Sequence, residues 1–347
     1  PPVLHSLASA STITWLIHQK FELSIPLYRQ EKEWEALGLR LSRATMSNWL
    51  LVVYRDWLVH IVHRLKLELL KQRYLHIDET HVQVLKEPGR KNTSDSYMWV
   101  YCSIRDAVNP IRYFEYQPGR SGKYPEAFLR KYEGYIHTDA YSGYNAVSGV
   151  KRCLCYTHLR RAFVDALPKD IHNSEASKPA EAILRLNQLF NIESELEALP
   201  PDQKKKERLI REKPLLEAFW SWAEKSAIGE LPKSKLSKAF HYALNNREGF
   251  WNYLEDGNCS ISNSLAENCI RPFVIGRKNW LFSGSPKGAE ASAGIYTLVE
   301  TAKANGLAPM KYIKYILSDM PGSAFLEHPE YLDDYLPWNP LVKEFCR

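Results

Sequence analysis

The sequence predicts an α/β protein, in which a mixed sheet with flanking helices is preceded by a helical region and interrupted by an all-helical insertion. Three observations support this prediction. Residues 1–70 have helical spacing of apolar side chains, residues 74–116 hold runs of β-branched and aromatic residues between turn signals, and residues 180–254 return to helical spacing.

The composition is that of a folded, water-soluble protein. Of 347 residues, 45% are hydrophobic and 25% are charged, and the net charge is +6. This mild excess of positive charge is compatible with a polyanionic partner but does not establish one. The length allows one large domain or two to three smaller ones.

Cysteine usage and the absence of long apolar runs predict a cytoplasmic location. The six cysteines form no C-x-x-C pair, so we expect free thiols in a reducing compartment. We find no apolar run of about 18 residues and no signal-peptide pattern, so we expect no membrane partner. The sequence opens Pro1-Pro2 without Met, which suggests a fragment of a longer protein.

Residues 1–72 form the predicted N-terminal helical region. Glu31 to Leu37 has helical spacing that Gly38 ends, and Ser42 is placed to cap a helix that continues to about Leu70. Two helices around a short glycine-containing turn resemble a helix-turn-helix. A plain helical hairpin packed on the core is the alternative, and the sequence leaves both open.

The next region predicts five strands and three helical segments. Strands are expected at 74–85, 97–104, 111–116, 134–139 and 152–156. Helices or helical turns are expected at 121–132, 140–147 and 158–167. The resulting order, β-β-β-α-β-α-β-α, is that of the ribonuclease H-like fold, and the first three strands suggest an antiparallel meander.

Residues 168–347 complete a predicted division of the chain into four parts. Helical segments alone fill the insertion, and further helices are expected around Glu267, from Glu290 to about Asn305, and from about Met310 to Leu317. The predicted parts are a helical region (1–72), a ribonuclease H-like domain (73–167 plus 256–320), a helical insertion (168–255) and a C-terminal tail (321–347).

Three carboxylates occupy the positions that a two-metal site needs in this fold. Asp78 lies within the first strand, Asp139 ends the fourth strand, and Glu267 lies on a late helix. Phosphodiester cleavage needs an activated oxygen nucleophile and a stabilised leaving oxygen, and two Mg²⁺ ions supply both. Mg²⁺ prefers hard oxygen ligands and keeps several waters, so a few carboxylates suffice.

Taken singly, each carboxylate has a structural explanation. An Asp at a strand end, as at Asp139, is usually a turn former or helix cap, and Glu267 can be the capping-box partner of Ser264. Asp78 is more unusual because it interrupts an otherwise apolar strand, where an unpaired carboxylate is costly. The neighbouring Glu79 should point to the opposite face of that strand.

Several segments together resemble the insertion-sequence-66 family of bacterial DDE transposases. These are residues 76–80 (HIDET), 137–144 (HTDAYSGY) and, most specifically, 267–282 (ENCIRPFVIGRKNWLF). Residues 26–31 and 336–339 look like the same family, so the resemblance covers nearly the whole chain.

The resemblance implies a metal-dependent recombinase that moves a DNA element. Asp78, Asp139 and Glu267 match the family's catalytic and metal-binding positions, whereas Asn268 stands where the family usually has Arg. The implied metal is Mg²⁺, with Mn²⁺ as a substitute. The implied partners are double-stranded DNA of the element ends and target, a second copy of the chain on DNA, and accessory proteins of the same element. The implied location is nucleoid-associated.

The family's full-length members also carry an upstream zinc-binding segment and a coiled-coil-like start, which this chain lacks. The element Cys155-Tyr156-Thr157-His158 resembles a C-x-x-H motif, but the neighbouring Cys153 and Cys155 are spaced poorly for tetrahedral ligation. We expect no zinc in this chain. A structural pair with His158 near a substrate phosphate is the favoured interpretation.

Basic and aromatic residues around the predicted site are candidates for DNA binding. Cations can bind the phosphate backbone and aromatic rings can stack on an unpaired base. The candidates are His158, Arg160, Arg161, Arg271, Arg277, Lys278, Trp280 and Lys287. An ion pair with a nearby carboxylate is the structural alternative for Arg271, and aromatic packing beneath a surface loop is the alternative for Trp280.

Two other functions remain open at this stage. A ribonuclease H-like nuclease would cut DNA without joining strands, and only the family resemblance argues against it. A truncated, inactive DNA-binding remnant would fit a chain without its upstream region, although the intact set of Asp78, Asp139 and Glu267 argues against that.

Overall fold

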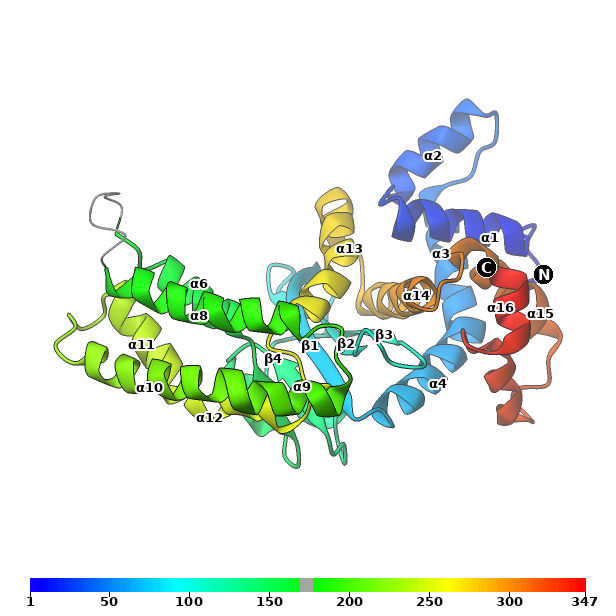
Figure 1. Cartoon of the computed structure of the whole chain (residues 1–347). Helices are drawn as coiled ribbons and strands as arrows, with labels where there is room; N and C mark the ends of the chain where they lie inside the picture. Colours follow the sequence, from blue (N-terminus) through cyan, green and yellow to red (C-terminus); the bar gives the residue numbers. More distant parts are fainter. Residues whose placement is uncertain (169–176) are drawn as a thin grey trace. The chain divides into compact units, whose positions relative to one another are not determined.

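The computed structural model describes residues 1–168 and 177–347, which divide into two compact units (Figure 1). Unit 1 comprises residues 1–72, 77–124 and 265–347. Unit 2 comprises residues 73–76 and 125–264. The division into four parts expected from the sequence stays a prediction.

A mixed sheet confirms the predicted α/β class. Its strand order is β3-β2-β1-β4-β5, and β6 also pairs with β1. The pairs β1–β4, β4–β5 and β1–β6 are parallel, whereas β2 and β3 are antiparallel. The strands are β1 (Tyr74–Val84), β2 (Asp95–Ser103), β3 (Arg112–Gln117), β4 (Tyr135–Thr138), β5 (Lys151–Leu154) and β6 (Phe282–Ser283).

The N-terminal helices of unit 1 follow the expected caps. Ser42 accepts a hydrogen bond from the N–H of Thr45 at 3.1 Å, and the chain then stays helical to Leu70. Gly38, at φ 85°, ends the preceding helix. The helices are α1 (Ala10–Ile17), η1 (His18–Glu22), α2 (Leu27–Ala36), α3 (Arg43–Val53), η2 (Tyr54–Leu58) and α4 (Val59–Leu70). One face of α3 is buried, and a helix-turn-helix role stays a prediction.

A long buried helix, α14 (Pro286–Ala304), closes the β3 side of the sheet in unit 1. The hydroxyls of Thr297 and Thr301 accept hydrogen bonds from the N–H groups of Phe114 (2.8 Å) and Arg112 (3.1 Å) on β3. Covering an edge strand in this way satisfies backbone groups that would otherwise be open to another strand. The remaining helices of unit 1 are α13 (Ser264–Trp280), α15 (Pro309–Asp319), η6 (Met320–Gly322), η7 (Pro329–Tyr335) and α16 (Pro340–Cys346).

Unit 2 joins β4 and β5 to a helical core. Aromatic residues of α6, α10 and α11, such as Phe163, Trp220 and Phe240, are fully buried in it. Helices α8, α10 and α11 pack together, as Figure 1 shows. The described helices of this unit are α5 (Lys123–Phe128, which starts in unit 1), η3 (Ser142–Ala146), α6 (Tyr156–Val164), α8 (Lys178–Glu195), α9 (Pro201–Glu207), η4 (Arg208–Glu212), α10 (Lys213–Ala227), α11 (Lys235–Asn245), α12 (Arg247–Trp251) and η5 (Asn252–Glu255).

Two prolines behave differently from the sequence expectation. Pro201 was expected only to stop a helix, yet it opens α9, because a proline is tolerated in a first turn where the N–H has no helical partner. Pro272 was expected to kink its helix or limit its length; α13 continues past it to Trp280, so the length is not limited there, and the kink stays a prediction. The two-residue strand β6 was not predicted.

In the described parts of the chain, no helix combines the length and apolar character needed to cross a membrane.

Candidate active site

Asp78 lies on β1 and is half-buried. Its Oδ1 accepts a hydrogen bond of 2.9 Å from the backbone N–H of Glu79. Glu79 itself is neutralised by Arg120, whose Nε and Nη2 lie 2.7 and 2.6 Å from Oε1 of Glu79. An ion pair therefore occupies Glu79, in keeping with its exclusion from the predicted metal site.

Asp139 follows β4 directly and is also half-buried. Its Oδ1 accepts a hydrogen bond from the N–H of Tyr141 at 3.0 Å, a turn that aspartate commonly stabilises. Arg152 on β5 fixes the backbone of this turn. Its guanidinium donates to the carbonyl oxygens of Asp139 (2.6 Å) and Tyr141 (2.8 Å) and to Oγ1 of Thr138 (2.7 Å). The sequence analysis did not single out Arg152.

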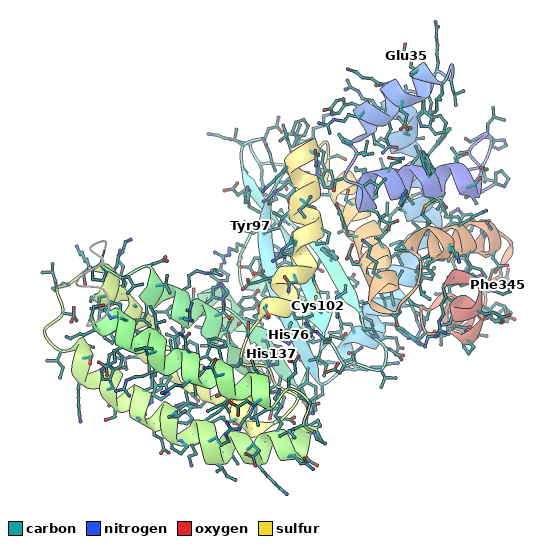
Figure 2. All side chains as sticks on the ribbon, turned by 45° about the horizontal axis from the view of Figure 1, so that its top comes forward. Glu35, His76, Tyr97, Cys102, His137 and Phe345 are labelled. Atoms are coloured by element: carbon teal, nitrogen blue, oxygen red, sulfur yellow. The ribbon has the colours of Figure 1, made fainter. Side chains whose placement is uncertain are left out.

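A stacked histidine pair lies two residues before the two aspartates. His76 on β1 pairs in register with His137 on the parallel strand β4, and their rings stack at 4.2 Å (Figure 2). Nδ1 of His137 lies 3.1 Å from the carbonyl of Leu75, and Nε2 accepts from the N–H of Ser260 at 2.9 Å. Because a carbonyl only accepts, Nδ1 of His137 is the donor in this pair of hydrogen bonds and Nε2 is the acceptor.

Glu267 lies in the first turn of α13 and is half-buried. The helix begins at Ser264 itself, so Ser264 is the first helical residue rather than the capping residue before the helix. The expected capping box is therefore not formed, since the residue before the helix is Asn263 and the third residue after it is Ala266 rather than Glu267. The side-chain Oδ1 of Asn263 instead lies 3.0 Å from Nδ1 of His76.

The three predicted carboxylates are divided between the compact units. Asp78 and Glu267 belong to unit 1, and Asp139 belongs to unit 2. Their convergence on shared metal ions stays a prediction.

Cys155 and His158 form a polar pair at the start of α6. The thiol of Cys155 accepts a hydrogen bond from the N–H of Asn263 at 3.2 Å. Burial raises the pKa of Cys155, but hydrogen bonds from His158 and Asn263 outweigh it and bring the pKa below its ordinary value. The ligand atoms of Cys155 and His158 lie within 4.8 Å of one another, so both the structural interpretation of the C-x-x-H motif and the phosphate contact of His158 stay predictions.

A second cluster of potential metal ligands was missed by the sequence analysis. His137, Cys153 and Cys259 are buried in unit 2, and their ligand atoms lie within 4.8 Å of one another. Both ring nitrogens of His137 already bond to Leu75 and Ser260. A hydrogen bond to Cys153, together with burial, raises the pKa of Cys259, which favours the thiol over the thiolate that metals bind. In this arrangement the three side chains pack together in the interior of unit 2. No sequence spacing revealed it, because three separate segments contribute.

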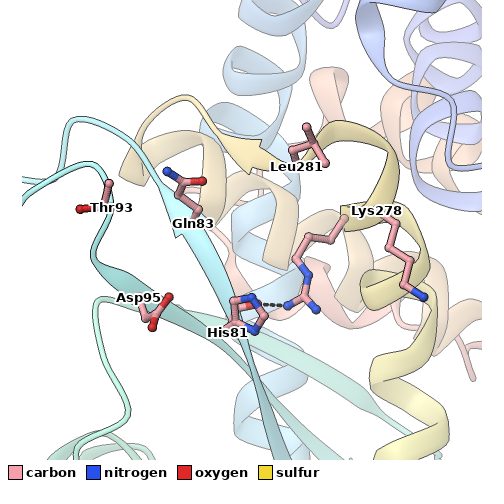
Figure 3. Close-up of a pocket in the computed structure, with 7 residues that line it drawn as sticks. His81, Gln83, Thr93, Asp95, Lys278 and Leu281 are labelled. Carbon is pink, nitrogen blue, oxygen red and sulfur yellow. Dashed lines mark hydrogen bonds between the residues drawn. The ribbon is translucent and has the colours of Figure 1, made fainter.

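Three of the predicted DNA-binding residues lie along α13. Arg271 and Lys278 are exposed, and Arg277 is half-buried. Arg277 donates to Oγ1 of Thr80 at 3.0 Å and to the carbonyl of His81. Arg277 and Lys278 line a pocket together with residues of β1 and of the β1–β2 connection (Figure 3).

Trp280 and Lys287 differ in what surrounds them. The ring of Trp280 packs on Phe273 and Tyr296 at centroid distances of 6.2 Å, and the ammonium of Lys20 lies over it at 5.6 Å. The ring of Trp280 thus packs against other aromatic residues, as the structural alternative expected, and its role in DNA binding stays a prediction. Lys287 is exposed in the first turn of α14.

The two arginines of α6 also differ. Arg160 donates from Nε to Oδ1 of Asn187 on α8 at 2.7 Å, so it has a partner within unit 2. Arg161 is exposed. Arg161 is therefore better placed of the two to bind a phosphate from solution, and both DNA roles stay predictions.

Comparison with known protein families gives an extended match. The model of the family described as "Transposase IS66 family" matches residues 5–291. No solved structure matches the chain.

Three similar proteins come from Sinorhizobium fredii and are described as uncharacterized. Protein y4qI is 28% identical over 96% of the chain, y4hP is 26% identical over 93%, and y4jD is 25% identical over 96%. The chain spans 60% of the length of y4hP, 63% of y4qI and 66% of y4jD.

Proposed function

Because the chain belongs to the IS66 family of transposases, we propose that it cuts DNA at the ends of a mobile element and joins the cut strands to a target. Asp78, Asp139 and Glu267 are the proposed catalytic residues and hold two Mg²⁺ ions, which Mn²⁺ can replace.

The observation that carries the proposal is the register of β1 and β4. His76 and His137 are paired in these parallel strands, and two residues further along the chain Asp78 lies within β1 and Asp139 directly follows the end of β4. Side chains two residues apart on a strand share a face. The strand order β3-β2-β1-β4-β5 and its mixed directions also support a ribonuclease H-like fold.

The donor set fits magnesium. All three side chains offer carboxylate oxygens, which are the hard ligands that Mg²⁺ prefers, and each is half-buried rather than fully enclosed, which leaves room for water ligands. When bound, the two ions activate the attacking oxygen and stabilise the leaving oxygen. Arg152 acts as a positioning residue, because it donates to the carbonyl oxygens of Asp139 and Tyr141 and to the side chain of Thr138, and so holds the turn at Asp139.

Double-stranded DNA is the proposed substrate, and two copies of the chain act on it. The proposed contacts to DNA are Arg271, Arg277, Lys278, Lys287, Trp280, His158, Arg160 and Arg161. Exposure of Arg271, Lys278 and Lys287 supports phosphate binding by these three.

Substitution of Asp139 tests the proposal. The substrate is labelled duplex DNA that carries the sequences flanking the coding region of the chain, with Mg²⁺ or Mn²⁺. Asp139→Asn should lower cleavage by at least about 10³-fold, since one carboxylate ligand is lost, and leave DNA affinity nearly unchanged. Asp202→Asn, at an exposed aspartate on α9, is the matched control and should cut normally.

The products separate the competing functions. Cut DNA with a strand joined to a second duplex supports a transposase, and cut DNA without any joined product identifies a nuclease. If the wild-type chain shows no metal-dependent cleavage, or if Asp139→Asn loses binding and cleavage equally, the proposed role of Asp139 is wrong.

A further inference from the structure

A single residue, Leu281, connects α13 to β6 in unit 1. The helix ends at Trp280 and the strand begins at Phe282, so Leu281 alone makes the turn. It does so at φ 66°, in the left-handed region that side chains other than glycine rarely adopt. Its side chain is 64% exposed.

Contacts on both sides hold Leu281 in this conformation. Its N–H donates to the carbonyl of Arg277 at 2.8 Å, which closes the last turn of α13. The next residue, Phe282, is held in register opposite Gln83 of β1. At the ends of α2 and α14 the same left-handed position is filled by Gly38 and Gly306. Among the described residues other than glycine that have a positive φ, Leu281 is the only one with an apolar side chain, and that side chain is exposed.

Leu281 lies at the border of a pocket that we call the Leu281 pocket. Its volume is about 450 Å³, well above that of a single water or ion. Thr93 and Asp95 lie across it from Leu281 and Lys278 (Figure 3). The complete lining is His81, Gln83, Thr93, Asp95, Arg277, Lys278 and Leu281.

Arg277 brings a positive charge to this pocket and forms no ion pair with any described residue, although the carboxylate of Asp95 also lines the pocket. Within the described parts of the chain its hydrogen bonds go only to Thr80 and the carbonyl of His81. Burial lowers the pKa of Arg277, which reflects the cost of a partly desolvated cation. An external anion would supply the missing charge.

We propose that the Leu281 pocket binds one unpaired nucleotide of DNA, with its phosphate at Arg277 and Lys278 and with Leu281 inserted in the gap that its base leaves in the stack. Apolar side chains such as leucine are used in this way to separate base steps. The inference rests on the proposed function, because it takes DNA as the substrate.

Asp95 favours a nucleotide over a simple anion as the occupant. A carboxylate in the lining repels a free phosphate or an acidic peptide, but it can accept a hydrogen bond from the exocyclic amino group of a base. Thymine has no such group. We therefore expect the pocket to prefer cytosine to thymine.

The test compares two 30-base-pair duplexes in EDTA, where no metal-dependent cleavage can occur. One duplex is fully paired and the other has a single unpaired cytosine, and fluorescence anisotropy measures the affinity of the chain for each. The wild-type chain should bind the bulged duplex about tenfold more tightly, because a captured base is typically worth that much. Replacement of the unpaired cytosine by thymine should reduce this preference, and Asp95→Asn should remove the difference between the two bases.

Leu281→Gly separates folding from binding. Glycine tolerates φ 66°, so this variant should melt about 2 °C higher than the wild type while its preference for the bulged duplex falls towards one. Lys233→Gly, at an exposed residue with φ 68° in unit 2, is the matched control. It should relieve similar strain and keep the preference. Arg277→Ala should weaken binding to both duplexes and also remove the preference.

Equal affinity of the wild-type chain for the two duplexes would overturn the proposal, as would a full preference in Leu281→Gly. These outcomes are independent of catalysis. If the chain prefers the bulged duplex but never cuts DNA, the proposed function is wrong and the nucleotide site is supported. If the chain cuts DNA but shows no preference, the proposed function is supported and the nucleotide site is wrong.

Discussion

Arg208 in unit 2 and Arg277 in unit 1 are both withdrawn from solvent, but they differ in how their positive charge is compensated. Arg208 is fully buried and makes a two-pronged ion pair with Glu193, at 2.6 and 2.8 Å. It also donates to the carbonyl oxygens of Tyr253 (3.1 Å), Asp256 (3.1 Å) and Cys259 (2.8 Å). Despite burial, these partners raise the pKa of Arg208.

Arg277 is half-buried and bonds only to neutral oxygens of Thr80 and His81, so burial lowers its pKa. The difference separates a cation that stabilises the fold from a cation suited to a ligand. Removing the first takes from the half-buried Glu193 its two-pronged partner and leaves only Lys204, at 3.6 Å, whereas removing the second leaves no carboxylate without a partner. Mutation of the two arginines should therefore affect different properties.

The largest expected effect is on folding, from Arg208→Met. Loss of the guanidinium leaves Lys204, at 3.6 Å, as the remaining cation beside Glu193 and removes the donor to three carbonyl oxygens, which should lower the free energy of unfolding by about 3–5 kcal/mol. Urea unfolding monitored by tryptophan fluorescence measures it. Arg211→Met is the matched control, because Arg211 pairs with Glu195 at the surface one turn away and should cost less than about 1 kcal/mol. Equal losses for the two variants would contradict the buried role of Arg208.

The charge cluster of Arg208, Glu193 and Glu212 should also make the free energy of unfolding depend on pH. Burial and the charge of Glu193 raise the pKa of Glu212 from 4.5 to about 8. Between these values the folded chain keeps a proton that the unfolded chain releases, so the unfolded state binds fewer protons and stability falls as the pH rises. We expect a loss of roughly 3 kcal/mol between pH 5 and pH 8, measured as urea midpoints.

Glu212→Gln should remove most of this slope, because an amide does not titrate. Glu217→Gln, at an exposed residue of α10, should leave the slope in place. A slope that persists in Glu212→Gln would assign the pH dependence to another group.

The smallest expected effect on stability comes from Arg277→Met, which should change the free energy of unfolding by less than about 1 kcal/mol. Its effect should appear in DNA binding. Loss of one phosphate contact should weaken binding to duplex DNA and reduce the slope of log affinity against log salt by about one. Anisotropy titrations from 50 to 200 mM salt measure it, with Arg130→Met, at an exposed arginine of unit 2, as the control. An unchanged salt slope would exclude a phosphate contact.

Local patterns predicted most of the secondary structure. The strand around Asp78, the cap at Ser42 and the glycine stop at Gly38 depend on residues within a few positions of one another, and all three are confirmed. The prediction failed where the local signal was too short or ambiguous. Strand β6 has two residues, fewer than an alternating pattern needs, and Pro201 fits a helix start as well as a helix stop.

Consecutive residues were enough to predict the α/β class, the strand that carries Asp78, the strand end before Asp139 and the transposase family, because periodicity and motifs are local features of the chain. Only the tertiary structure decided that Arg208 is neutralised while Arg277 is not, and that Leu281 is held in a left-handed turn beside a pocket. Each of these depends on partners far away in the chain, such as Cys259 for Arg208 and β1 for the end of α13. Charge balance and backbone strain are properties of the assembled neighbourhood, and no spacing along the chain encodes them.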